Sequence, residues 1–396
     1  MLGLREGVIF SVMPALLSMV LLFQPSWFLR ARLRVDASHL ATPLLLALTP
    51  LVVSVLLTDP SNLIVYGSYL IVCCVIGVFI ALHHESSFRD LPFAVLVVGL
   101  FGSLVPILQI ATNGAAHVAR IALDKNSNVL GLASSATIAA LAALIVGTSV
   151  GKTFWLKILA SGAFVVNLAV AVLTFTRSVW LSLALCIPIY LLLLRGRMEA
   201  PRPGRRGDLL SWIAFWGLPL LAVSSAPVAL AAVFGTKVLD FMVQFGSKRI
   251  FTAIDFVSAG PLVGDTSTVE HSRLFGYSWD RLGFWGHGID IQERMAGSGI
   301  YPHNSYLQAA YDGGILLGFL FLLISAVIPL SLLVLRFRWG KLTATDAFLV
   351  LLFINVQGDQ LFHATPYNSS TWTVVLLVYL LIARPAAQAA GTLAAA

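Results

Sequence analysis

Long apolar runs separated by short polar segments extend along the chain from Val8 to Ile382. Most runs approach the roughly 20 residues that a helix needs to cross the hydrocarbon core of a bilayer. Backbone polar groups at that depth must be hydrogen-bonded within the protein, so the runs predict helices. We therefore expect an all-α polytopic membrane protein with about eleven spanning helices, in a range of about 10 to 12. The predicted spans are residues 8–26, 40–57, 62–82, 91–111, 129–148, 155–175, 178–194, 209–234, 313–335, 345–361 and 369–383.

The apolar stretch from residue 158 to residue 194 is too long for one crossing. Its only charged residue is Arg177. A continuous helix of that length would extend to roughly 55 Å at about 1.5 Å per residue, well beyond the thickness of the hydrocarbon core. The chain is therefore expected to turn near residues 174–178, which places Arg177 at a membrane face.

Basic residues between the spans predict the orientation, because loops rich in lysine and arginine stay in the cytoplasm. Three basic clusters are separated by even numbers of predicted spans, so all of them fit the cytoplasmic side. The turn at Arg177 and the long segment 235–303 then lie on the opposite side. This segment, between the spans at 209–234 and 313–335, is the one large extracytoplasmic loop. The clusters are Arg30, Arg32 and Arg34; Arg195, Arg197, Arg202, Arg205 and Arg206; and Arg336, Arg338 and Lys341.

Composition supports the bilayer as the solvent for this chain. Hydrophobic residues make up 58% of it and charged residues 11%, whereas a soluble domain has roughly 25% charged residues. A single signal peptide cannot account for apolar runs along the whole length, so residues 1–396 are predicted to form one integral membrane domain. The formal net charge of +7 comes with basic loops and without the basic, aromatic-interleaved stripe of nucleic-acid-binding proteins. No nucleic acid is therefore expected as a partner.

Two parts of the large loop differ in composition. Residues 238–256 mix apolar and charged side chains, which fits a helix lying in the membrane interface. Residues 260–301 are rich in glycine, serine and aspartate and also contain tryptophan. This composition predicts an ordered but irregular loop that packs on the helix bundle.

Arginines at the extracytoplasmic face are the first candidates for chemistry. Arg177 follows Thr174 and Thr176, and an ionisable group near membrane depth is a functional hypothesis by default. The alternative is an interfacial anchor beside Trp180, with the guanidinium reaching toward water. Arg273 lies early in the large loop. Because arginine is always charged and binds phosphate oxygens in a fork, a pair of arginines on this face suits a diphosphate.

A histidine at the end of the same loop is the candidate base. His303 is followed by Asn304 and Ser305, either of which can cap the next helix and hold His303 at its mouth. An imidazole can take a proton near neutral pH. The alternative is a loop histidine whose hydrogen bonds are satisfied.

Other histidines and the cysteines carry weaker indications. His363 lies in another outward turn and could line an acceptor path. The cluster His83-His84-Glu85 at a cytoplasmic helix end is better explained as a solvated group than as a metal site, and the three cysteines have no metal-ligand or disulfide spacing. No metal site is predicted.

Three elements together resemble the superfamily of O-antigen ligases and O-antigen polymerases. Its members carry a Thr-x-Ser-Arg-like element that opens a helix, here Thr174 to Arg177 with Thr176 in the serine position. They also carry an arginine early in a large periplasmic loop, here Arg273. A His-Asn-x-x-Leu element before an acidic, glycine-containing turn completes the set, here His303-Asn304 to Leu307 and then Asp312 to Gly318.

The resemblance implies a membrane glycosyltransferase with a GT-C-type helix bundle in the bacterial inner membrane, its active site facing the periplasm. Such an enzyme moves a glycan from a polyprenyl diphosphate to an acceptor hydroxyl, inverts the anomeric centre and uses neither metal nor cofactor. His303 would be catalytic and Arg177 and Arg273 would bind the donor diphosphate. Supporting or substrate-lining roles would fall to Asn304, Thr174, Thr176, Asp312 and His363.

Three functions remain open at this point. The first is a polymerase that extends lipid-linked repeat units, with partners in a polysaccharide export assembly and membrane lipids around it. The second is an O-antigen ligase that transfers a finished glycan to lipid A-core, which differs in acceptor rather than in chemistry. The third is a transporter or flippase of lipid-linked glycans, although charged residues are scarce at mid-bilayer depth in the predicted spans.

Overall fold

The structure, a computed structural model, describes residues 91–113, 129–149, 153–174, 176–196, 215–217, 266–287, 302–339, 343–362, 374–375 and 378. All regular secondary structure in these residues is helical. The chain separates into two compact units, each of which is described by itself. The first, here called the bundle unit, comprises Ser86–Val269 and Lys341–Asp359. The second, called the His303 unit, comprises Met1–Glu85, Glu270–Gly340 and Gln360–Ala396.

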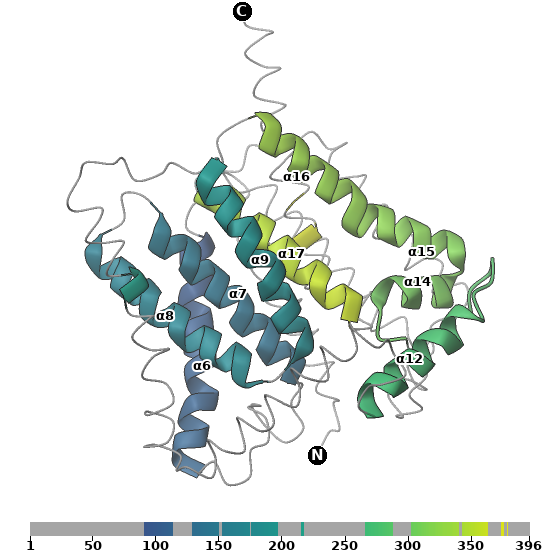
Figure 1. Cartoon of the computed structure of the whole chain (residues 1–396), viewed down its shortest axis with the longest axis horizontal. Coiled ribbons are helices and arrows are strands. Elements are labelled where there is room, and N and C mark those ends of the chain that lie inside the picture. The colour runs from purple at the N-terminus through teal and green to yellow at the C-terminus, as the bar shows by residue number, and fades with distance from the viewer. Residues whose placement is uncertain are drawn as a thin grey trace, which may run out of the picture. The chain divides into compact units, whose positions relative to one another are not determined.

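Helices of the bundle unit coincide with the predicted spans (Figure 1). The structure therefore confirms the predicted helices at 91–111, 129–148, 155–175, 178–194 and 345–361. It also confirms the predicted break, because one helix ends at Leu173 and the next begins at Arg177. The helices are α6 Leu91–Asn113, α7 Val129–Thr148, α8 Phe154–Leu173, α9 Arg177–Gly196 and α17 Ala344–Phe362, with α17 belonging to this unit up to Asp359 and to the His303 unit from Gln360 onward.

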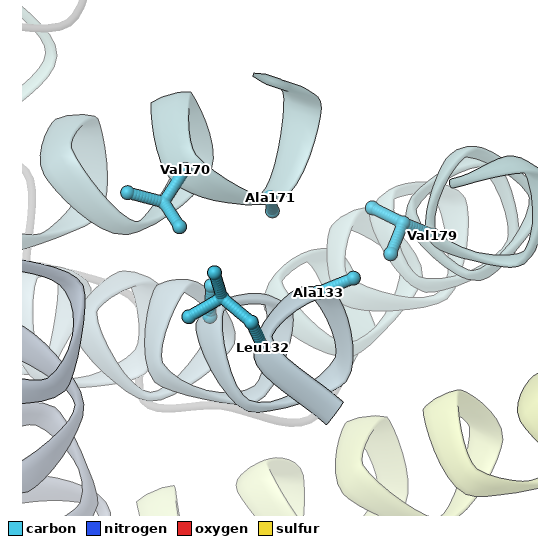
Figure 2. Packing of buried hydrophobic residues seen from close by; sticks show 6 residues of the cluster. Leu132, Ala133, Val170, Ala171 and Val179 are labelled. Atoms are coloured by element: carbon cyan, nitrogen blue, oxygen red, sulfur yellow. The ribbon is translucent and has the colours of Figure 1, made fainter. Parts of the chain in front are cut away.

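Small side chains allow these helices to approach closely. Nearly all of α7 from Leu132 onward is buried, and much of that buried surface is alanine. On α6, Gly99 faces Ala139 so closely that a Cβ at Gly99 would overlap the Ala139 methyl group. Figure 2 shows packing through similarly small side chains where α7 meets α8 and α9, in a cluster of valines, alanines and one leucine. Helix association through small residues is typical of membrane bundles, where the lipid supplies no hydrophobic driving force between helices.

Buried polar side chains form hydrogen bonds between helices of the bundle unit. The Ser103 hydroxyl of α6 donates to Asn167 Oδ1 of α8 at 2.7 Å, while Asn167 Nδ2 donates to its own helix at the Ala163 carbonyl. The Tyr190 hydroxyl of α9 donates to Thr148 Oγ1 of α7 at 2.6 Å. Each such bond between membrane helices contributes about 0.6 kcal/mol on average, so these bonds fix helix register more than they stabilise the bundle.

The His303 unit contains a short helix that is followed directly by a long apolar one, together with a further helix. They are α12 Thr266–Trp279, α14 Ser305–Gly313, α15 Ile315–Leu322, the π-helix η4 Leu323–Val327 and α16 Ile328–Trp339, with α12 belonging to the unit from Glu270 onward. The last three are continuous and confirm the predicted helix at 313–335. In Figure 1, α12, α14 and α15 form one green group. Ala309 of α14 packs against Phe321, Ile324 and Val375, with Tyr306 and Leu320 beside them.

The prediction of an irregular loop over 260–301 is wrong for residues 266–279, which form α12. Its glycine and serine content favoured a loop, but Leu274 and Ser278 are buried four residues apart and give the segment one inward face. Burial of one face stabilises a helix whose composition is unfavourable. Gly276 sits in this helix with open space around it.

Two helices of the described part, Phe154–Val172 and Ile315–Val334, are long and apolar enough to cross a bilayer. Their length and apolar composition are what make them candidate spans. The predicted spans at 8–26, 40–57 and 62–82 and the interfacial helix predicted at 238–256 lie outside the described residues. In the predicted spans at 209–234 and 369–383, the described residues are 215–217, 374, 375 and 378, and all are helical.

Candidate functional site

The backbone of His303 lies in a conformation that side chains rarely adopt. Its φ is 47°, and no other non-glycine residue in the described part of the chain has a positive φ. The residue follows the buried Pro302 and is itself half-buried. Left-handed backbone at a non-glycine residue costs about 1 to 3 kcal/mol and concentrates at functional sites. His303 is therefore held where local preference alone would not place it.

The amide of Asn304 joins His303 to its surroundings on two sides. Asn304 Oδ1 accepts a hydrogen bond from the Leu307 N–H at 3.0 Å, which is an N-cap of α14. Asn304 Nδ2 donates to the Leu361 carbonyl at 3.2 Å. The structure thus confirms the capping role predicted for Asn304 and adds a second bond. Because Asn304 is next in sequence to His303, both bonds restrict the position of the histidine backbone.

A buried polar pair lies one turn further along α14. Gln308 Nε2 donates to Asp312 Oδ1 at 2.6 Å, and the two residues are 0% and 1% exposed. Gln308 Oε1 has no hydrogen-bond partner among the described residues. The Asp312 side chain is therefore buried and hydrogen-bonded within its own helix, and its supporting or substrate-lining role stays a prediction.

Tyr306 connects α14 to the π-helix. Its hydroxyl hydrogen-bonds with Ser325 of η4, and its ring packs edge-on against Phe321 with centroids 5.5 Å apart. Burial raises the pKa of Tyr306 to about 12, with the Ser325 bond acting in the opposite direction. The phenol therefore stays protonated at physiological pH. A π-turn inside an α-helix is frequently found at functional sites.

Arg273 lies on α12 in the His303 unit, and its side chain is exposed. The adjacent residue, Leu274, is buried and fixes which side of α12 faces the protein. Just after α12, the Arg281 guanidinium lies 3.5 Å from the centroid of the Tyr277 ring. Arg273 therefore lies on the exposed side of α12.

The Thr-x-Thr-Arg element occupies the break between α8 and α9. Thr174 is fully buried and its hydroxyl donates to the Ala171 carbonyl at 2.6 Å, which commits it to the end of α8. Thr176 is also buried, but its hydroxyl has no partner in the described part of the chain. Arg177 is the first residue of α9, where unpaired backbone N–H groups favour an anion. This element therefore offers a hydroxyl and a helix N-terminus in addition to a cation.

Asp359 of α17 is a candidate that the sequence analysis missed. The Ser134 hydroxyl of α7 donates to Asp359 Oδ2 at 2.6 Å, and the Ser178 hydroxyl at the start of α9 also hydrogen-bonds to this carboxylate. Asn355 Nδ2 donates to Ser134 Oγ at 3.5 Å. The carboxylate thus joins α17 to α7 and α9. Its partner Ser178 directly follows Arg177 in sequence. An acidic residue inside the predicted span 345–361 was the signal that would have found it.

The predicted site residues fall in both units. His303, Asn304, Asp312 and Arg273 belong to the His303 unit, where Asn304 and Asp312 act on the same helix. In the bundle unit, the second group consists of Thr174, Thr176 and Arg177. A common site that includes Arg177 and His303 stays a prediction.

His363 lies outside the described residues. The described residues contain no group of three or more histidine, cysteine, aspartate or glutamate side chains that could hold a metal ion. A comparison of the chain with models of protein families found no match, and a search of curated proteins found none.

Proposed function

We propose that this protein is a membrane glycosyltransferase that polymerises polysaccharide repeat units carried on a polyprenyl diphosphate. The observation that supports it most is His303, held with a positive φ before a capped helix. Strain of this kind has to be maintained by surrounding structure, and here Asn304 supplies two of the bonds. The resemblance of the His-Asn element to O-antigen ligases and polymerases supplies the reaction class.

In the proposed reaction, an acceptor hydroxyl attacks the anomeric carbon of the donor glycan. The new glycosidic C–O bond forms as the bond to the diphosphate breaks, which inverts the anomeric centre and releases polyprenyl diphosphate. His303 takes the proton of the acceptor hydroxyl. Arg177 and Arg273 stabilise the negative charge that grows on the leaving diphosphate, with the N-terminus of α9 contributing its N–H groups.

The proposal places the protein in the bacterial inner membrane. About eleven helices would cross the bilayer, in a GT-C-type bundle, with residues 235–303 on the periplasmic side. Two described helices of sufficient length and apolarity support a membrane location. The donor would be a polyprenyl-diphosphate-linked glycan, the acceptor a second glycan, and the surrounding partners membrane lipids and a polysaccharide export assembly.

The test uses full-length protein reconstituted in liposomes with a polyprenyl-diphosphate-linked repeat unit. His303→Ala should lower the transfer rate about 10²- to 10⁴-fold, the usual contribution of a general base. Arg177→Ala and Arg273→Ala should each lower it about 10²- to 10³-fold, as for the loss of one donor to a developing anion. Released polyprenyl diphosphate and glycan length are measured together.

Two matched control variants come from the His303 unit. His287→Ala removes an exposed histidine whose Nε2 donates to the Arg281 carbonyl, and Arg281→Ala removes a cation that stacks on Tyr277. Both should retain most of the transfer rate. Full activity of the His303→Ala variant would contradict the role of His303 as base.

The ligase alternative is separated by the acceptor. In cells that lack the protein, a polymerase defect leaves single repeat units on the lipid carrier, whereas a ligase defect leaves long lipid-linked chains. In the liposome assay, a ligase would transfer glycan to added lipid A-core and not to a second lipid-linked repeat.

A transport function is favoured by one observation, the carboxylate of Asp359 within an apolar helix. Ionisable residues in such positions mark ion and substrate pathways in transporters. Transport would move the lipid-linked glycan across liposomes without release of polyprenyl diphosphate. In that case Asp359→Asn would abolish movement and His303→Ala would not.

A further inference from the structure

The long helix of the His303 unit has one exposed apolar face. The opposite face of the same helix, including Leu317, Phe321 and Ile324, is buried. The exposed positions are mostly three or four residues apart, so they form a stripe along a helix that is long enough to cross a bilayer. The stripe consists of Ile315, Leu316, Phe319, Leu322, Val327, Leu330 and Val334.

Residues 282–287, here called the aromatic turn, extend this stripe at its N-terminal end. The Ile315 N–H donates to the Gly283 carbonyl at 3.1 Å, and a Cβ at Gly314 would overlap the Phe284 carbonyl oxygen. The backbone of the turn therefore lies directly against the start of α15. Phe284 is 64% exposed and Trp285 77%, with ring centroids 5.1 Å apart.

The His287 imidazole, at the end of the turn, already has contacts within the protein. His287 Nε2 donates to the Arg281 carbonyl, and the imidazole stacks on Tyr311 with centroids 4.5 Å apart. The Arg281 guanidinium stays at the surface above Tyr277. The turn thus has two exposed aromatic rings and directly follows an exposed arginine in sequence. Tryptophan in this combination is typical of the headgroup layer of a membrane, where arginine pairs with phosphate.

We propose that the aromatic turn lies in the interfacial layer of the phospholipid bilayer, with Trp285 at headgroup depth and the stripe of α15–α16 in the hydrocarbon. The backbone bond between the turn and Ile315, together with the exposure of Phe284, Trp285 and the stripe, carries this proposal. It requires the membrane location and not the proposed transfer reaction. The backbone N–H of His287 donates to the Tyr311 carbonyl of α14 at 2.9 Å, so in this proposal the turn also holds α14 close to the membrane surface.

Tryptophan fluorescence in liposomes tests the depth of the turn. Full-length protein is reconstituted in phospholipids brominated either near the headgroup end or near the methyl end of the acyl chains. The signal of Trp285 is the difference between the unchanged protein and Trp285→Phe. We expect the shallow bromines to quench most of this signal, the deep bromines to quench little of it, and aqueous iodide to quench it weakly.

A second variant gives a depth ruler and protects the test against local misfolding. Phe319→Trp, made in the Trp285→Phe background, puts the probe on α15, about 6 Å along the helix from Ile315 at about 1.5 Å per residue. Phe319 is exposed, so a larger ring fits. This probe should respond more strongly to the deep bromines than Trp285 does.

Two outcomes would overturn the proposal. One is a Trp285 signal quenched by iodide and by neither lipid, which would put the turn in water. The other is iodide quenching that disappears only when a polyprenyl-diphosphate-linked glycan is added, which would make the turn a substrate surface. Because the measurement needs no glycan transfer, a protein without transferase activity can still support it.

Discussion

The bundle unit and the His303 unit maintain their structure by different means. In the bundle unit, regular helices pack through alanine, glycine and valine, and hydrogen bonds between side chains join neighbouring helices. In the His303 unit, residues with positive φ at His303 and Gly314 border a short capped helix, and a buried amide–carboxylate pair lies within that helix. Tolerance to substitution should therefore be limited by volume in the first unit and by backbone conformation in the second.

Gly314→Ala should have the largest effect. Gly314 has φ 88° and ψ 168°, a region that essentially only glycine occupies, and an added Cβ would overlap the backbone of Phe284. We expect the free energy of unfolding to fall by about 3 kcal/mol or more, combining backbone strain with overlap against backbone that cannot rotate away. Thermal unfolding in detergent micelles measures it. The control is Gly276→Ala on α12, where the Cβ meets open space and a gain of about 0.5 to 1 kcal/mol is expected.

Gly99→Ala tests the bundle unit and should have an intermediate effect. Its methyl group would overlap that of Ala139, so α6 and α7 must move apart. Overpacking of this kind costs about 1 to 3 kcal/mol. The matched control is Gly102→Ala on the same helix, where the Cβ has nothing within 4 Å. Equal unfolding temperatures for the two variants would contradict the close approach of α6 and α7.

Asn304→Ala should have the smallest effect on stability, although the residue adjoins the proposed base. Loss of the N-cap costs about 1 kcal/mol. Asn304→Asp keeps the acceptor for the Leu307 N–H and removes the donor to the Leu361 carbonyl. Stability of the Asp variant should lie between those of the unchanged protein and Asn304→Ala. If the bond to Leu361 positions His303, both variants should lower transfer more than stability, which parallel transfer assays and unfolding curves would detect.

Helix positions followed from the sequence because apolar runs of about 20 residues predict helices of membrane-spanning length. The break near Arg177 was predictable for the same reason, since one helix could not have contained 158–194. The cap at Asn304 followed from local chemistry, which requires only a side-chain oxygen before a helical segment. In contrast, α12 could not be inferred, because the burial of Leu274 and Ser278 that gives it an inward face appears only in the folded structure.

Sequence by itself determined the all-helical character of the described chain, the approximate positions of the helices in the bundle unit and most of the residues worth testing as a site. Tertiary structure decided the backbone conformation of His303, the burial of Asp312 and the partners of Asp359. The physical reason is the distance along the chain over which each interaction acts. Hydropathy and capping act within one segment of chain, whereas a positive φ, a buried carboxylate or a hydrogen bond between helices exists only when separate segments pack and hold it in place.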